Sequence, residues 1–142
     1  MPITKGFKQL LKDANARIVT RTVEETRALL SDENIVLVDI RDPRELERDG
    51  KVPGAFHAPR GMLEFRVDPE RPYFKPIFAD ESKHFVLFCG GGWRSALSAA
   101  ALQDMGMTNV SHVEGGFAAW KESGGPIALR PLVRQRSPIG TE

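Results

Sequence analysis

The chain has 142 residues, enough for one domain that buries a hydrophobic core without disulfides or metal ions. Its 20 basic and 19 acidic residues give a formal net charge of +1, so no overall field favours nucleic acid or an acidic membrane. A single cysteine excludes an internal disulfide, the first residues lack a basic and apolar leader, and no apolar run is long enough to span a bilayer. We therefore expect a cytoplasmic protein with no nucleic-acid or membrane partner.

The N-terminal segment 1–19 is predicted to be an amphipathic helical extension. Its apolar residues recur at helical spacing, at Phe7, Leu10, Leu11, Ala14 and Ile18. Lysine and arginine occupy its other faces, and we expect this helix to pack on the domain rather than on a membrane surface. A second helix should be capped by Thr20 or Thr22 and should end near Ser31 and Asp32.

Two continuous apolar runs predict parallel strands that are covered on both faces. Residues 35–40 and 84–88 are rich in β-branched, leucine and aromatic side chains, and the second run delivers Cys89 at its carboxyl end. An alanine-rich helix should start near residue 95 and end at Gly106, and a further strand is expected over 109–113. This order predicts an α/β fold whose ligand lies beyond the carboxyl ends of the strands.

Two stretches outside these elements are rich in proline or glycine. The segment 50–79 is predicted to be a long excursion with one short helix near 62–65, part of which should overhang Cys89. After residue 125 the composition changes again, and the tail 126–142 with its prolines and arginines is expected to be extended.

Cys89 opens the candidate catalytic loop. The loop continues with Gly90, Gly91, Gly92, Trp93, Arg94 and Ser95. Its glycines allow a tight turn between strand and helix, so that backbone N–H groups point inward. Inward amides at the positive end of a helix stabilise an anion and favour a nucleophilic thiolate at Cys89. A buried and inert cysteine followed by a flexible loop is the alternative interpretation.

The side chains around Cys89 have competing roles. Arg94 either donates to an anionic substrate or bridges a buried carboxylate that holds the loop in shape, and we favour the bridge. Trp93 should face outward, either as a lid or docking surface or as a packing residue. Ser95 should cap the next helix rather than donate its hydroxyl to the sulfur. Arg60 is a candidate for extra positive charge at the mouth of the site. The histidines are expected in loops or at strand ends, outside the chemistry: His57, His84 and His112.

Three segments resemble, in the same order, the signatures of the rhodanese family of sulfurtransferases in its single-domain form. They are residues 37–41, the loop 89–95 and residues 114–120, and the resemblance covers about 20–125. One departure is visible. The chain has Lys51 where family members commonly carry histidine before a Pro-Gly-Ala turn, which leaves the predicted fold unchanged.

The resemblance implies a three-layer α/β domain over 20–125, with a central and mainly parallel sheet flanked by helices on both faces. It implies that Cys89 carries sulfur as a persulfide between a small sulfur-containing anion such as thiosulfate and an acceptor, in a ping-pong cycle. The acceptor would be a small thiol, a protein or cyanide. Asp39 and Arg41 match the family's Asp-x-Arg pair, which we interpret as scaffold. No cofactor and no metal are implied, and a monomer and a homodimer are both compatible with it.

Two alternatives stay open. A cysteine phosphatase would use a similar loop, but phosphatases of related families have one more residue between cysteine and arginine than the four that separate Cys89 from Arg94. The shorter loop is expected to be too small to surround a phosphoryl group. The second alternative is a non-catalytic protein-binding module on the same fold; such modules usually lose the nucleophile, which this chain retains.

Overall fold

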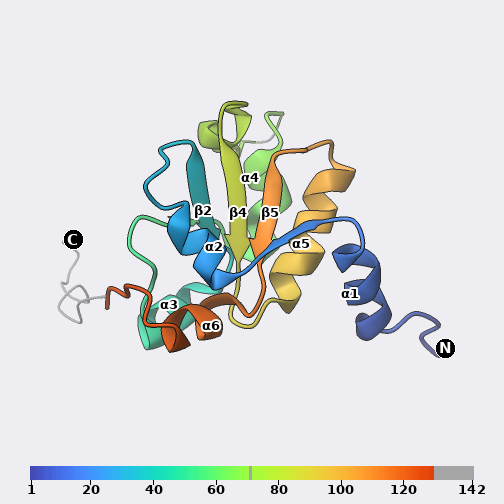
Figure 1. Cartoon of the computed structure of the whole chain (residues 1–142). Coiled ribbons are helices and arrows are strands. Elements are labelled where there is room, and N and C mark those ends of the chain that lie inside the picture. Colours follow the sequence, from blue (N-terminus) through green and yellow to red (C-terminus); the bar gives the residue numbers. More distant parts are fainter. Residues whose placement is uncertain (71, 130–142) are drawn as a thin grey trace, which may run out of the picture.

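A computed structural model describes residues 1–70 and 72–129, and its centre is a five-stranded sheet (Figure 1). The strands are β1 (Val19–Arg21), β2 (Ile35–Asp39), β3 (Phe56–His57), β4 (His84–Phe88) and β5 (Val110–Val113). Their order in the sheet is β1-β5-β4-β2-β3, and all four pairings are parallel. The predicted mainly parallel sheet is therefore confirmed, and the carboxyl ends of its strands meet at one edge.

Helices cover both faces of the sheet. They are α1 (Phe7–Asn15), α2 (Val23–Ala28), α3 (Pro43–Asp49), α4 (Leu63–Val67), α5 (Trp93–Asp104) and α6 (Gly116–Glu122), with 3-10 turns η1 (Arg60–Met62) and η2 (Pro76–Ala79). One buried cluster joins α1, α4 and α5 to the sheet, and a second joins α2 and α6 to its other face (Figure 1). The three-layer α/β architecture is confirmed.

Alternation along β4 explains why its sequence is continuously apolar. Phe85 and Leu87 belong to the cluster beneath α5, whereas Val86 and Phe88 belong to the cluster beneath α2 and α6. Successive side chains of a strand point to opposite faces, so a strand buried on both faces needs apolar residues at every position. The next residue, Cys89, again lies on the α5 side.

Most predicted elements are found within a few residues of their predicted bounds. The expected N-terminal helix is α1, and Thr22 caps α2 by accepting a hydrogen bond from the backbone N–H of Glu25 at 3.0 Å. Helix α5 begins at Trp93, two residues before its predicted start. The prediction missed β1, β3 and α3, although Asp42 and Pro43 form a recognisable start signal for α3.

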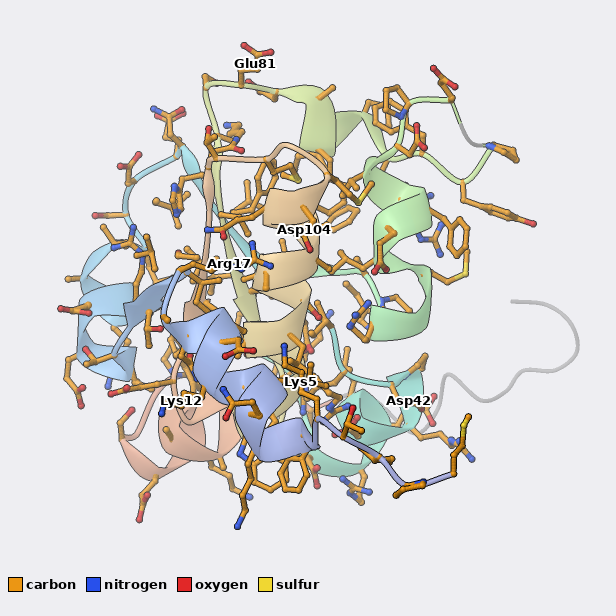
Figure 2. The ribbon with its side chains drawn as sticks, turned by 90° about the vertical axis from the view of Figure 1, so that its right-hand side faces the viewer. Lys5, Lys12, Arg17, Asp42, Glu81 and Asp104 are labelled. Atoms are coloured by element: carbon orange, nitrogen blue, oxygen red, sulfur yellow. The ribbon has the colours of Figure 1, made fainter. Side chains whose placement is uncertain are left out.

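The terminal segments contact the domain. Helix α1 lies across α5, where Arg17 pairs with Asp104 at 3.1 Å (Figure 2). At the other end, the backbone of Ala128 bridges that of Lys51 through two hydrogen bonds. The boundaries at residues 20 and 125 stay predictions, and residues 130–142 of the expected tail lie outside the described residues.

No helix among the described residues combines the length and the hydrophobicity that crossing a membrane requires.

Candidate active site

Cys89 follows β4 directly and is almost fully buried, with 1% of its surface exposed. Its sulfur accepts hydrogen bonds from the backbone N–H groups of Gly92 at 3.1 Å and of Ser95 at 3.4 Å, and the Ser95 hydroxyl lies 3.6 Å away. Sulfur forms such contacts weakly as a thiol, and they strengthen when it carries a negative charge. The loop therefore directs two backbone donors at the sulfur.

Gly92 allows the shape of the loop because a residue with a side chain would be strained there. Its φ of +103° lies in the left-handed region, and a Cβ atom at this position would come within 3.0 Å of the backbone nitrogen of Gly115. Gly92 is also the N-cap of α5, so the helix begins at Trp93, and the amide of Ser95 in its first turn faces the sulfur.

The start of α6 holds the loop from outside. The backbone N–H groups of Phe117 and Ala118 donate to the carbonyls of Cys89 and Gly90, at 2.7 and 3.0 Å. Gly116 has a φ of +57°, and a Cβ atom there would overlap the Cys89 carbonyl. Gly115 and Gly116 at the start of α6 thus permit a close approach of two backbone segments, which fixes the carbonyl side of the loop.

Arg94 forms a bidentate ion pair with Glu45, the third residue of α3. The distances are 2.8 Å from Nη1 to Oε1 and 3.0 Å from Nη2 to Oε2. Glu45 also accepts a hydrogen bond from the backbone N–H of Asp42, within the cap of α3. The Arg94 guanidinium lowers the pKa of Glu45 to about 2. The structure thus pairs Arg94 with a carboxylate, as favoured, but Glu45 is 20% exposed rather than buried, and the sequence analysis did not identify it.

Arg41 and Asp39 form a second ion pair, and each of the two side chains is 1% exposed. Nε and Nη2 of Arg41 donate to the Asp39 carboxylate at 3.0 and 2.8 Å, and Nη2 also donates to the Gly50 carbonyl at 2.9 Å. The guanidinium carbon lies 4.0 Å from the ring centre of Phe117. This pair therefore ties β2, the end of α3 and the start of α6 together behind the loop.

Arg60 does not contribute a free charge to the site. Its guanidinium pairs with Glu64, one helical turn further along the chain, at 2.9 Å. Its backbone N–H donates to the carbonyl of Ile40, which anchors η1 beside the end of β2. His57 donates from Nε2 to the carbonyl of Arg41 at 2.7 Å, an ordinary structural hydrogen bond like the one we expected.

Two predictions about Ser95 and His112 are wrong. Ser95 lies inside the first turn of α5 and makes no cap, because Gly92 already occupies the N-cap position. Its hydroxyl instead pairs with Nδ1 of His112 at 2.9 Å and approaches the Cys89 sulfur. His112 lies within β5 rather than in a loop or at a strand end, and it is 2% exposed. No pattern in the sequence indicated that His112 is buried beside Ser95.

A cavity of about 400 Å³ opens onto the sulfur and is lined by Cys89, Gly91, Trp93 and Arg94. The described residues of segment 50–79 do not line this cavity, contrary to the expected overhang. Phe78 of that segment instead packs in the core, with its ring centre 5.0 Å from that of Phe85. The wall of the cavity is Trp93, whose side chain is 62% exposed and faces outward as predicted. Its ring lies 5.1 Å from that of Phe7, so α1 supports this wall.

Comparisons with known proteins agree with this geometry. A family model described as the rhodanese-like domain matches residues 22–123. A sulfurtransferase from Allochromatium vinosum is 31% identical over 102 residues, which are 72% of this chain and 86% of that protein.

Two solved structures extend the likeness. One from Rhodopseudomonas palustris, described as a protein of unknown function and possible tyrosine phosphatase, is 55% identical with a TM-score of 0.86 and covers 90% of this chain and 98% of its own. The polysulfide-sulfur transferase homodimer of Wolinella succinogenes is 31% identical with a TM-score of 0.66 over 92% and 93% of the two chains.

Proposed function

The chain belongs to the rhodanese-like family of sulfurtransferase-type proteins, and from that premise we propose that it carries sulfur on Cys89 as a persulfide. One observation supports the proposal most strongly. The only cysteine of the chain lies beneath an open cavity with two backbone N–H groups donating to its sulfur. Such an arrangement stabilises a negative charge on sulfur before the reaction and on the persulfide after it.

The proposed cycle has two stages. In the first, the Cys89 thiolate attacks the outer sulfur of thiosulfate, the sulfur–sulfur bond of the donor breaks, and sulfite leaves with the bonding electrons. In the second, an acceptor such as cyanide or a thiolate attacks the outer sulfur of the persulfide, and the Cys89 thiolate is the leaving group. No cofactor or metal takes part in either stage. Polysulfide is a second candidate donor, because the Wolinella relative is named for it.

A cysteine phosphatase is the competing function, since the Rhodopseudomonas relative is described as a possible tyrosine phosphatase. The position of Arg94 favours sulfur transfer. Both of its terminal nitrogens are bound to Glu45, which leaves them turned to a carboxylate of the protein rather than to a phosphoryl group over Cys89. The loop also has only four residues between the two side chains.

Intact-mass measurement tests the proposal directly. The protein is incubated separately with thiosulfate, with polysulfide, with a mercaptan donor and with a cysteine desulfurase, and a gain of one sulfur atom is expected with at least one of them. Because the chain has one cysteine, a gain of one sulfur atom places that atom on Cys89. The Cys89→Ser protein should show no gain and should have the same circular dichroism spectrum as the parent. No gain from any donor would favour the non-catalytic binding module, and hydrolysis of a phosphate ester would favour the phosphatase.

The partners follow from the chemistry. We propose a small sulfur-containing anion as donor and a thiol, free or on a protein, as acceptor, with the chain acting in the cytoplasm as a monomer or homodimer. A lone cysteine cannot resolve its own persulfide as an internal disulfide, so the sulfur must leave to another molecule. Light scattering decides between monomer and homodimer, and non-reducing mass analysis after oxidation should show no intramolecular disulfide.

A further inference from the structure

A chain of side-chain hydrogen bonds leads from the Cys89 sulfur to the surface. The Ser95 hydroxyl lies 3.6 Å from the sulfur and 2.9 Å from Nδ1 of His112. On the far side of the ring, Nε2 of His112 pairs with the Thr20 hydroxyl at 3.2 Å. Ser95 and His112 are buried whereas Thr20 is exposed, so the chain connects the reactive atom to solvent by a route other than the cavity over Cys89.

The register of the sheet fixes this alignment. Thr20 of β1 lies opposite His112 of β5, and β5 in turn pairs with β4, which ends beside Cys89. Thr20, the exposed end of this hydrogen-bond series, borders a groove of about 400 Å³. The groove is lined by Asn15, Thr20, Gly91, Gly92, Trp93, His112, Glu114 and Gly115.

The single proton of the Ser95 hydroxyl has two places to go. When Cys89 is a neutral thiol, its S–H donates to the Ser95 oxygen, and the hydroxyl proton points to the Gly92 carbonyl at 3.4 Å. When the sulfur is ionised, the same hydroxyl proton can turn to the sulfur. An N–H donated by Nδ1 of His112 would occupy a lone pair of the Ser95 oxygen and favour the orientation toward the sulfur. Nε2 would then be the acceptor nitrogen, with the Thr20 hydroxyl as its donor.

The charge of His112 fits this arrangement. Burial lowers the pKa of His112 to about 4, so at neutral pH the ring is uncharged and has one donor and one acceptor nitrogen. A neutral ring relays hydrogen-bond direction without placing a second full charge beside the sulfur. The charged groups nearby are the Arg94–Glu45 pair, the buried Arg41–Asp39 pair and Glu114 in the groove.

We propose that Thr20, His112 and Ser95 form a directional series of hydrogen bonds in which each group donates to the next and the Ser95 hydroxyl donates to the Cys89 thiolate. Ser95 would then add a third donor to the amides of Gly92 and Ser95, and His112 and Thr20 would be positioning residues. The inference deepens the proposed function, because it concerns how the same thiolate is stabilised. It assigns a role to His112 that depends on its tautomer rather than on its taking up a proton.

The test measures the pH midpoint at which Cys89 reacts with a small alkylating agent, which does not require sulfur transfer. Loss of one hydrogen bond to a charged sulfur should raise this midpoint by about one pH unit in Ser95→Ala and in His112→Leu. The double variant should show no further rise, and Ser95→Thr, which keeps the hydroxyl, should stay close to the parent. Thr20→Val removes the hydroxyl at the exposed end of the hydrogen-bond series. It should raise the midpoint too, but by less than Ser95→Ala does.

The protein contains a matched control on the opposite face of the sheet. His84 pairs through Nε2 with the Ser111 hydroxyl at 3.0 Å, and Ser111 also accepts from Arg21, but this pair does not touch Cys89. Ser111→Ala and His84→Leu should therefore leave the midpoint unchanged.

If a folded Thr20→Val or His112→Leu protein kept the parental pH midpoint, the proposed hydrogen-bond series would be wrong. It would also be wrong if Ser111→Ala and His84→Leu shifted the midpoint equally. Failure of the protein to gain sulfur from any donor would overturn the proposed function and leave this measurement intact.

Discussion

Arg41 and Arg94 each hold a carboxylate with two nitrogens, but one pair lies behind the active-site loop and the other at its mouth. Arg41 and Asp39 are 1% exposed, and Arg41 also donates to the Gly50 carbonyl. Arg94 is 43% exposed and Glu45 20%. The same chemistry therefore has two consequences. A buried pair cannot lose a partner without leaving a desolvated charge, whereas a half-exposed pair adds little stability and keeps its charge beside the cavity.

The largest expected effect comes from breaking the buried pair. Asp39→Asn leaves Arg41 charged and without its counter-ion in the interior, and we expect the free energy of unfolding to fall by about 3 to 5 kcal/mol. The matched change at the mouth, Glu45→Gln, should lower it by less than about 1 kcal/mol. Urea unfolding of both variants measures the two values. Similar losses would show that burial does not separate the pairs.

A smaller effect is expected from the glycines that neighbour the two arginines. Gly50, whose carbonyl binds Arg41, has a φ of +87°, and a Cβ atom there would lie 2.7 Å from Cγ2 of Ile127. Gly50→Ala should therefore cost about 2 kcal/mol of stability. A Cβ atom at Gly90 would meet only the flexible ends of Arg94 and Glu45, at 3.1 and 3.5 Å.

The control is thus Gly90→Ala, whose loss of stability should stay below about 0.5 kcal/mol because two mobile side chains can move aside. The measurement is again the free energy of unfolding in urea. If Gly90→Ala were the more damaging of the two, the mouth rather than the buried pair would be the rigid part of the loop's surroundings.

The two pairs also differ in how far the sequence predicts them. Asp39 and Arg41 lie two residues apart at the end of an apolar strand, so a local motif identifies both. Glu45 and Arg94 are 49 residues apart, and His112 is 17 residues from Ser95. Such contacts depend on how α3, α5 and β5 are placed around the sheet, which no local pattern specifies.

The backbone of the fold was easier to predict than the partners of its side chains. Strands β2 and β4 were identified because burial on both faces gives an unbroken apolar run, and Cys89 was found because it follows such a run and precedes glycines. Strand β3 has only two residues, too few to show a period. Helix α3 was overlooked despite its cap, because it carries only one buried side chain, Leu46.

At the mouth, the expected effect is on activity. Arg94→Ala removes a guanidinium that holds α3 to the loop, and we expect kcat/KM for sulfur transfer to fall by about ten- to hundredfold, the worth of one charge-assisted contact. If the bridge is what matters, Glu45→Gln should lower kcat/KM to a similar degree. Parental activity in Glu45→Gln, together with a loss in Arg94→Ala, would instead place Arg94 on the donor.

The smallest expected effect is a pH dependence that separates the mouth from the protein's interior. Arg94 lowers the pKa of Glu45 to about 2 from an ordinary 4.5, so this pair contributes stability above pH 4.5 that is lost as the pH falls toward 2. Burial lowers the pKa of His112 to about 4 from an ordinary 6.5, so its contribution is lost earlier, as the pH falls from 6.5 toward 4.

Glu45→Gln and the parent should therefore lose stability in parallel between about pH 6.5 and 4.5 and converge below that range, by no more than about 1 kcal/mol because solvent screens Arg94. Urea unfolding at a series of pH values measures the difference. Convergence above pH 4.5 would show that the difference between the two proteins comes from a group other than the Glu45 carboxyl, and a constant difference down to about pH 3 would show that the pair adds no pH-dependent stability.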